Sequence, residues 1–191
     1  MIVLAIDTAL DACSVALAAD REVRAHLSES MNKGQAERLA PMVQQAARRA
    51  NIAFAQIDRI AVTTGPGSFT GVRVGLSFAR ALALALSKPC LGVSTLEALA
   101  LQEGEDGLRG ALIETPGASY AALYENGATI IAPRAIERGE HVALVGGREA
   151  KIIGPDARPD VAALARRVMR LDPGRCPADP TYLRAPHVTP P

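Results

Sequence analysis

The sequence contains two copies of one opening pattern, and this repeat constrains the fold more than any single motif does. The segment AIDTALDACSVALAADREV at residues 5–23 aligns with LIETPGASYAALYENGAT at residues 112–129. Within it, Ile-Asp-Thr at residues 6–8 falls on Ile-Glu-Thr at residues 113–115. Because internal repetition at this scale indicates a duplicated structural unit, we expect two lobes built on one plan.

Each copy begins with three apolar segments joined by short turns, which predicts an antiparallel meander of three strands. The first copy then alternates between helical and strand patterns. Ser94, followed three positions later by Glu97, indicates a capping box at the start of its last helix. We expect helices at residues 34–50, 70–86 and 94–104, and strands at residues 58–65 and 88–94.

The second copy is shorter after its meander. We expect strands at residues 141–147 and 150–154, a helix at residues 159–171 and a proline-rich, extended tail with a frayed end. The sequence therefore predicts an α/β protein with a first lobe at residues 1–106 and a smaller second lobe at residues 107–191. Duplicated lobes of this kind resemble the actin, sugar-kinase and Hsp70 ATPase superfamily, abbreviated ASKHA, which implies a fold and not a function.

A glycine-rich segment, TTGPGSFTGVRVG at residues 63–75, joins a predicted strand to a predicted helix. It lacks the Gly-Lys-Ser/Thr ending of a P-loop, and its glycine spacing is one residue too long for a dinucleotide fingerprint. Two interpretations stay open: a vestigial phosphate loop, or a structural loop with a tight turn, a helix cap and close backbone packing. The residues concerned are Gly65, Gly67, Ser68, Thr70 and Gly71.

The turn after the first strand is where nucleotide phosphates approach in ASKHA proteins. Asp7 and Thr8 stand at this point, followed by Ala9 and Ala12 where a phosphate turn favours glycine. One interpretation is a vestigial nucleotide turn in which Asp7 holds magnesium through water. The other is local capping of the strand end by the Asp7 and Thr8 side chains.

The helix at residues 70–86 is apolar around most of its circumference, interrupted by Arg73, Ser77 and Arg80. Such a helix must be covered on more than one side, either by a partner protein or by the chain's own helices. We predict a protein–protein interface made by one stripe on each long helix. Its residues are Leu39, Met42, Val43, Ala46, Val72, Leu76, Ala79 and Ala83.

The sequence offers no assembled catalytic or metal-binding set. The three histidines lie far apart without an HExxH or HxxxH pattern, and the three cysteines form no CxxC pair. A net charge of +1 indicates no strong affinity for nucleic acid by this chain alone. We find neither a basic leader nor a charge-free apolar run of about 20 residues. We therefore expect no cofactor, no metal, no membrane contact and a cytoplasmic location.

Three segments resemble the TsaB (YeaZ) family. They are the opening IVLAIDTALDACSVAL, the long string GPGSFTGVRVGLSFARALALALSKPCLGVSTLEALA and the late PTYLR at residues 180–184. The resemblance is strong over residues 1 to about 100 and patchy beyond. It implies the duplicated ASKHA fold and a non-catalytic subunit that pairs with TsaD. TsaD transfers threonylcarbamoyl to the adenosine beside the anticodon of tRNAs that read A-starting codons.

The resemblance also implies further partners. TsaE, an ATPase, would join the complex, tRNA would be met only through the complex, and the chain alone would be able to form a homodimer through the same first-lobe surface. Gln35 stands where relatives often carry histidine, and Glu114 replaces an aspartate in the second lobe's hairpin. The alternative from the residues themselves is an ATP-binding kinase or ATPase of the ASKHA superfamily. A metallopeptidase and a plain homodimeric scaffold are the other rivals.

Overall fold

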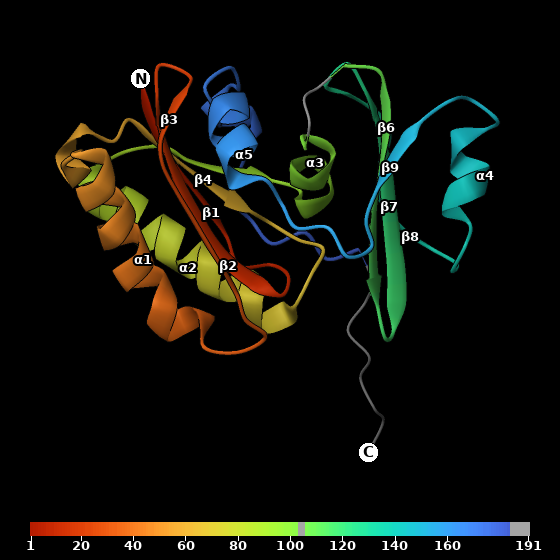
Figure 1. The fold of residues 1–191 in the computed structure, drawn as a ribbon, viewed down its shortest axis with the longest axis horizontal. Coiled ribbons are helices and arrows are strands. Elements are labelled where there is room, and N and C mark those ends of the chain that lie inside the picture. The colour runs from red at the N-terminus through yellow and green to blue at the C-terminus, as the bar shows by residue number, and fades with distance from the viewer. Residues whose placement is uncertain (103–105, 184–191) are drawn as a thin grey trace.

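The computed structural model describes residues 1–102 and 106–183 and contains two β-sheets with helices around and between them (Figure 1). The first sheet has the strand order β3-β2-β1-β4-β5. β1 pairs antiparallel with β2 and parallel with β4. Its strands are β1 (Ile2–Asp7), β2 (Ala12–Ala19), β3 (Glu22–Ser30), β4 (Arg59–Thr63) and β5 (Cys90–Val93).

The second sheet repeats this plan in reduced form, with the order β8-β7-β6-β9. β6 is the counterpart of β1, since it pairs antiparallel with the next strand and parallel with a later one. The meander predicted for each copy is therefore confirmed. The strands are β6 (Leu108–Thr115), β7 (Ala118–Glu125), β8 (Ala128–Ile136) and β9 (Lys151–Ile153).

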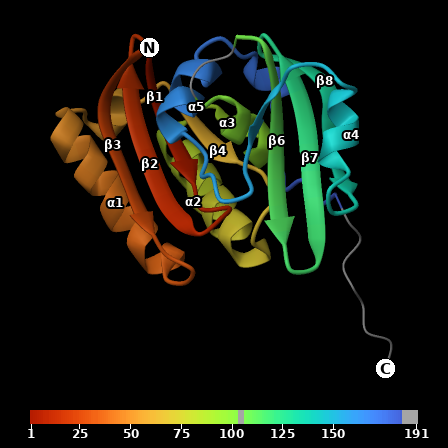
Figure 2. The same cartoon turned by 45° about the vertical axis from the view of Figure 1, so that its right-hand side comes forward.

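Two long helices lie side by side against one face of the first sheet (Figure 1), and Figure 2 shows the first of them alongside β2 and β3. They are α1 (Gln35–Ala50) and α2 (Phe69–Leu86). The opposite face is covered by α5 (Val161–Val168). The second sheet carries α3 (Thr95–Ala100) on one face and contacts the short α4 (His141–Val145). Two single turns of 3-10 helix, η1 (Phe54–Gln56) and η2 (Pro173–Arg175), complete the described elements.

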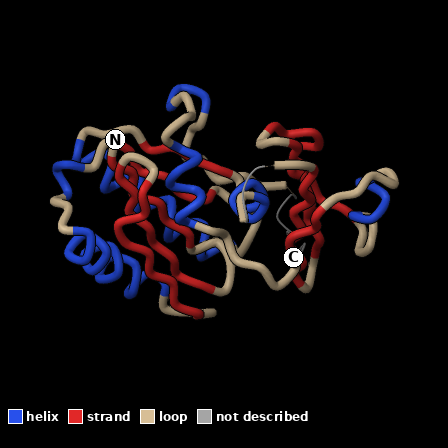
Figure 3. Tube along the Cα trace, turned by 45° about the horizontal axis from the view of Figure 1, so that its top comes forward, coloured by secondary structure: helices blue, strands red, loops and turns tan. Residues whose placement is uncertain are grey.

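The two lobes exchange their covering helices. α3 follows the first sheet in sequence, yet Leu96 and Leu99 pack with Ala111 and Ile113 of the second sheet. α5 follows the second sheet, yet its apolar side packs on Val3, Ala5, Ala16 and Ala18 of the first. The tube in Figure 3 shows these two helices between the strand layers. The proposed division between residues 106 and 107 separates the strands of the two sheets. Each sheet is nevertheless covered by a helix from the other lobe's part of the sequence, α5 on the first sheet and α3 on the second.

Polar contacts add to this exchange. Arg158 donates two hydrogen bonds to the Asp11 carboxylate, at 3.2 and 2.9 Å. This pairing lowers the pKa of Asp11. Arg167 of α5 donates to the Glu97 carboxylate of α3 at 3.2 Å. Arg59 donates to the carbonyls of Val168, the last residue of α5, and of Leu171, three residues later.

One predicted element is wrong. Residues 141–147 were expected to form a strand because valines suit strands, but residues 141–145 form α4. Gly146, with a φ of 62°, ends the helix in the left-handed conformation, and its N–H donates to the carbonyl of Ala143. The expected helix at residues 94–104 ends at Ala100, and residues 103–105 lie outside the described part of the chain.

We predict that α5 is an integral part of the first lobe's core. Leu164→Ala should lower the free energy of unfolding by about 2 to 5 kcal/mol, because Leu164 is fully buried against the first sheet. The matched control is Leu84→Ala, at a leucine that is 82% exposed, where we expect less than about 0.5 kcal/mol. Urea denaturation followed by circular dichroism measures both, and equal losses would show that α5 is only loosely attached.

Candidate partner-binding face of the first lobe

The glycine loop is packed directly against the turn between β1 and β2. A Cβ on Gly67 would lie 2.3 Å from the carbonyl oxygen of Ala9, and one on Gly71 would lie 2.1 Å from that of Thr8. The Ser68 N–H donates to the Ala9 carbonyl at 2.7 Å. The Thr8 hydroxyl donates to the Gly71 carbonyl, also at 2.7 Å. The glycines therefore permit close approach of two protein segments, and the geometry favours the structural interpretation of the loop.

The same loop also starts α2. Ser68 is the N-cap, and its hydroxyl accepts the Gly71 N–H at 3.3 Å, whereas Thr70 is exposed in the first turn. Gly65 has a φ of 102° and exchanges hydrogen bonds with Thr95 at the start of α3. The loop therefore joins the first turn, α2 and α3 into one rigid corner.

Asp7 lies inside this corner and is fully buried. Its Oδ1 accepts hydrogen bonds from the Thr63 hydroxyl at 2.6 Å and the Ala9 N–H at 3.2 Å. Its Oδ2 is buried and has no hydrogen-bond partner in the described residues. Burial is the main cause that raises the pKa of Asp7 to about 6. A carboxyl group in this position suits the local capping interpretation, because a water-bridged magnesium ion would need an accessible oxygen.

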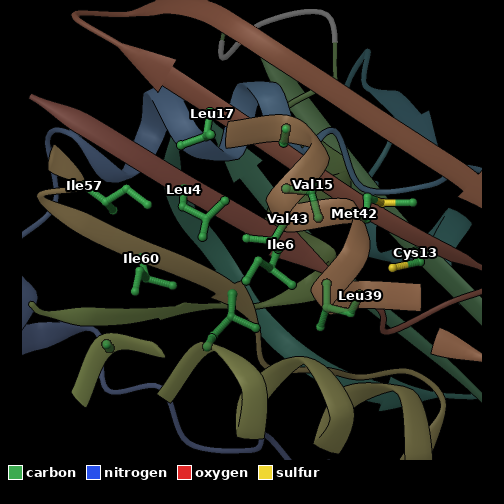
Figure 4. Packing of buried hydrophobic residues seen from close by; sticks show 14 of the residues in the cluster. Leu4, Ile6, Cys13, Val15, Leu17, Leu39, Met42, Val43, Ile57 and Ile60 are labelled. Carbon is green, nitrogen blue, oxygen red and sulfur yellow. The ribbon is translucent and has the colours of Figure 1, made fainter. Parts of the chain in front are cut away.

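The eight predicted interface residues do not face outward, so the prediction is wrong about the stripe. Leu39, Met42, Val43 and Ala46 of α1 lie in the core cluster with Leu4, Ile6 and Val15 of the sheet (Figure 4). Val72, Leu76, Ala79 and Ala83 of α2 belong to the same cluster and are at most 6% exposed. Helical periodicity identified these stripes correctly as apolar, and the sheet of the same lobe buries them.

The other side of α2 is open. α2 is the single helix in the described part of the chain that is long and apolar enough to span a membrane, with a mean hydropathy of 1.4. Only 33% of its 18 residues are buried, and they lie on the sheet. Leu84, near its end, is 82% exposed. An apolar helix fixed to a sheet along one side and open along another is typical of a protein-binding surface.

The exposed sides of α1 and α2 form a surface that we name the two-helix face. The positions that we assign to this face carry mainly small side chains, so that another helix would be able to approach closely, although the same helices also expose charged residues such as Glu37, Arg48 and Arg80. α1 contributes Ala40, Pro41 and Gln44, and α2 contributes Ser77, Ala81, Leu84 and Ala85.

A segment that sequence reasoning did not connect to α2 borders this face. We name residues 176–183 the strap. It continues the first sheet beyond β5, since the Gly92 N–H donates to the Cys176 carbonyl at 2.9 Å. It then lies along α2, where Arg80 forms an ion pair with Asp179 at 3.3 Å and Arg73 donates to the Tyr182 hydroxyl. The strap holds most of the PTYLR motif, although Arg184 lies outside the described residues.

The departures from the family pattern have structural roles. Gln35 is buried at the first position of α1, and its Nε2 donates to the Met31 carbonyl at 3.1 Å. Glu114 lies 3.8 Å from Arg138 in an ion pair at the end of β6. Within residues 1–102 and 106–183, no group of three His, Cys, Asp or Glu residues is placed to hold a metal ion.

Comparison with known proteins agrees with this geometry. Residues 25–123, about half of the chain, match a protein family described as TsaD, tRNA N6-adenosine threonylcarbamoyltransferase. A crystal structure titled YeaZ from Pseudomonas aeruginosa has a TM-score of 0.77 and 27% identity, and the match covers 95% of this chain and 99% of that one. The chain belongs to the TsaB (YeaZ) branch of the TsaD family. The predicted duplicated ASKHA fold is thereby confirmed.

Two relatives show how much of the chain is similar to known sequences. TsaB from Escherichia coli is 46% identical over 100 residues, which are 52% of this chain and 43% of the E. coli protein. The chain thus matches less than half the length of this curated relative. An uncharacterized protein of Mycobacterium bovis is 32% identical over 98% of this chain and 94% of its own length.

The packing of the glycine loop leads to a prediction about stability. Gly71→Ala should lower the free energy of unfolding by about 1 to 3 kcal/mol, because the new methyl group would clash with the Thr8 carbonyl oxygen. This result opposes the usual gain from replacing glycine by alanine in a helix. Gly117→Ala is the control, because a Cβ there meets no atom within 4 Å. A stable Gly71→Ala variant, measured by thermal unfolding, would contradict the close packing.

A second prediction concerns Asp7 and pH. Its pKa is about 6 in the folded chain and about 3.9 in an unfolded one, so the folded state holds the proton more tightly. The Asp7 contribution to stability is therefore full below about pH 4 and is lost as the pH rises to about 6. Asp7→Asn should become more stable than the parent chain across this interval, by on the order of 2 kcal/mol at pH 7. Urea titrations from pH 4 to 8 test this, and a pH-independent difference would refute it.

Proposed function

We propose that this chain is a non-catalytic subunit that binds a TsaD-type protein. In that complex it supports transfer of threonylcarbamoyl to the adenosine beside the anticodon of tRNAs that read A-starting codons. The observation that carries the proposal is α2, which is apolar yet only 33% buried. The names of the relatives support a role in tRNA threonylcarbamoyladenosine biosynthesis, since the E. coli relative is named tRNA threonylcarbamoyladenosine biosynthesis protein TsaB.

The chemistry of the two-helix face suits a helical partner. Ser77, Ala81 and Ala85 lie on the exposed side of α2 and would allow helix axes to approach within roughly 8 to 10 Å. Burying an exposed leucine such as Leu84 contributes about 1.5 to 3 kcal/mol. The exposed positions of both helices are therefore the proposed interface, in place of the buried stripes.

The packing around the first turn supports the non-catalytic part of the proposal. Gly67 and Gly71 are in contact with the β1–β2 turn, and the Asp7 carboxyl group is buried. The nucleotide interpretation assigns phosphate and magnesium to these groups, and their packing against protein atoms favours the non-catalytic proposal over an ATP-binding enzyme.

The proposal includes the remaining partners. TsaE would join as the ATPase of the complex, and tRNA would be met only through the complex. In the absence of a TsaD-type protein, two copies of the chain would pair through the same two-helix face, so that homodimer and heterodimer exclude each other. A cytoplasmic location is part of the proposal, and the free thiols of Cys13, Cys90 and Cys176 are compatible with it.

We predict that Leu84→Arg prevents complex formation without unfolding the chain. The change places a charge at the centre of an apolar contact but at a position that is 82% exposed in the free chain. The variant and the TsaD of the same organism are mixed and analysed by size exclusion with light scattering. The matched control is Val142→Arg, which places the same charge at an exposed apolar residue of a different helix, α4. A one-to-one complex formed equally by both variants would refute the proposed face.

A further inference from the structure

The strap and the first turns of α2 form a cluster of large exposed side chains that the proposed function does not use. The chain has three Phe, three Tyr and no Trp. Two of these six aromatic residues meet at one exposed place: Phe69 is 58% exposed and Tyr182 is 56% exposed. Their ring centroids are 6.2 Å apart, with an angle of 35° between the planes. Tyr and Arg are among the residues that dominate binding energy at protein interfaces.

Arg73 fixes both rings in place. Its guanidinium carbon lies 3.7 Å from the centroid of Phe69, which is a cation–π contact. Its Nε and Nη2 donate to the Tyr182 hydroxyl at 3.3 and 3.2 Å. We name Phe69, Arg73 and Tyr182 the aromatic cluster. Because these side chains are already held in place, binding would cost little further side-chain entropy, and their burial would contribute more of its free energy to affinity.

The strap positions the cluster independently of any partner. The Thr181 N–H donates to the Thr64 carbonyl at 2.8 Å, and the two hydroxyls are 3.0 Å apart. Asp179 pairs with Arg80 two turns further along α2. Gly92 allows the strap to approach β5, because a Cβ there would lie 2.4 Å from the Pro177 carbonyl oxygen. The strap is thus bound to the first lobe at several points directly before Tyr182.

The aromatic cluster and the two-helix face share the exposed side of α2. Phe69 and Arg73 stand at one end of α2 and Leu84 near the other, and an 18-residue helix is about 27 Å long. Between Arg73 and Leu84 the exposed residues of α2 are Ser77, Arg80 and Ala81, and the serine and alanine allow close approach but bury little area each. The cluster supplies the large side chains that a stable interface of about 800 Å² per partner requires.

We propose that the strap is part of the partner-binding surface and that the aromatic cluster is its main anchor for the TsaD-type protein, an inference that rests on the proposed function. The partner is expected to present an apolar pocket for the two rings, with an oxygen acceptor near Arg73. Protein is favoured over RNA as the occupant, because Arg80, the neighbouring cation on this side of α2, is already paired with Asp179.

The test compares binding of variants to the TsaD of the same organism by isothermal titration calorimetry. Tyr182→Ala should weaken binding by about tenfold or more, with the unfolding midpoint changed little. Tyr182→Phe keeps the ring and removes the hydroxyl that Arg73 contacts, so we expect a smaller loss. Val142→Ala, far from the strap, should bind as the parent chain does.

The outcomes separate this inference from the proposed function. If Leu84→Arg abolishes binding while Tyr182→Ala binds within about twofold of the parent chain, the anchor is refuted and the two-helix face stands. If the parent chain does not bind TsaD at all, both are refuted. If Tyr182→Ala leaves TsaD binding intact but reduces tRNA cross-linking to the complex, the cluster is an RNA contact and the inference is wrong.

Discussion

The close approach of the glycine loop to the first turn is the contact on which the rest of the first lobe depends. Gly67 and Gly71 let the start of α2 lie against the backbone of Thr8 and Ala9. This contact fixes where α2 begins and therefore which side of it lies on the sheet. The same backbone contacts therefore explain both the glycines of the loop and the placement of the helix on the sheet.

α2 has apolar residues both on its buried side and on its exposed side. Its sheet side contains the residues that hold it, from Val72 to Ala83, whereas apolar side chains such as Leu84 remain in solvent. The strap adds Tyr182 to this open side and uses Arg73 to hold it. The first lobe thus combines a rigid support with a preformed apolar surface, which is the combination that lowers the entropic cost of association.

Much of this fold follows from the sequence, and the failures have identifiable causes. The internal repeat predicted both meanders, and apolar periodicity placed α1 and α2 within about one residue at each end. Periodicity finds an apolar stripe but does not say what covers it, so the stripes assigned to a partner, including Leu39 and Ala79, proved to face the sheet. The contact of Arg73 with Tyr182 joins residues 109 positions apart and has no local signal. α4 was missed because its valines favour a strand until the two following glycines are considered.

The exchange of covering helices has a consequence for folding of the chain during its synthesis. Val3, Ala5 and Ala16 lie on a sheet face that is covered mainly by α5 and the residues directly after it, and the last strand of that sheet ends at Val93. At translation rates of about 5 to 20 residues per second, the interval before Val168 is made lasts roughly 4 to 15 seconds. During that time the nascent first lobe carries an uncovered apolar sheet. The core of the first lobe is therefore completed only after α5 has been made, and a chaperone that shields this sheet face would act on the growing polypeptide and not on the folded protein.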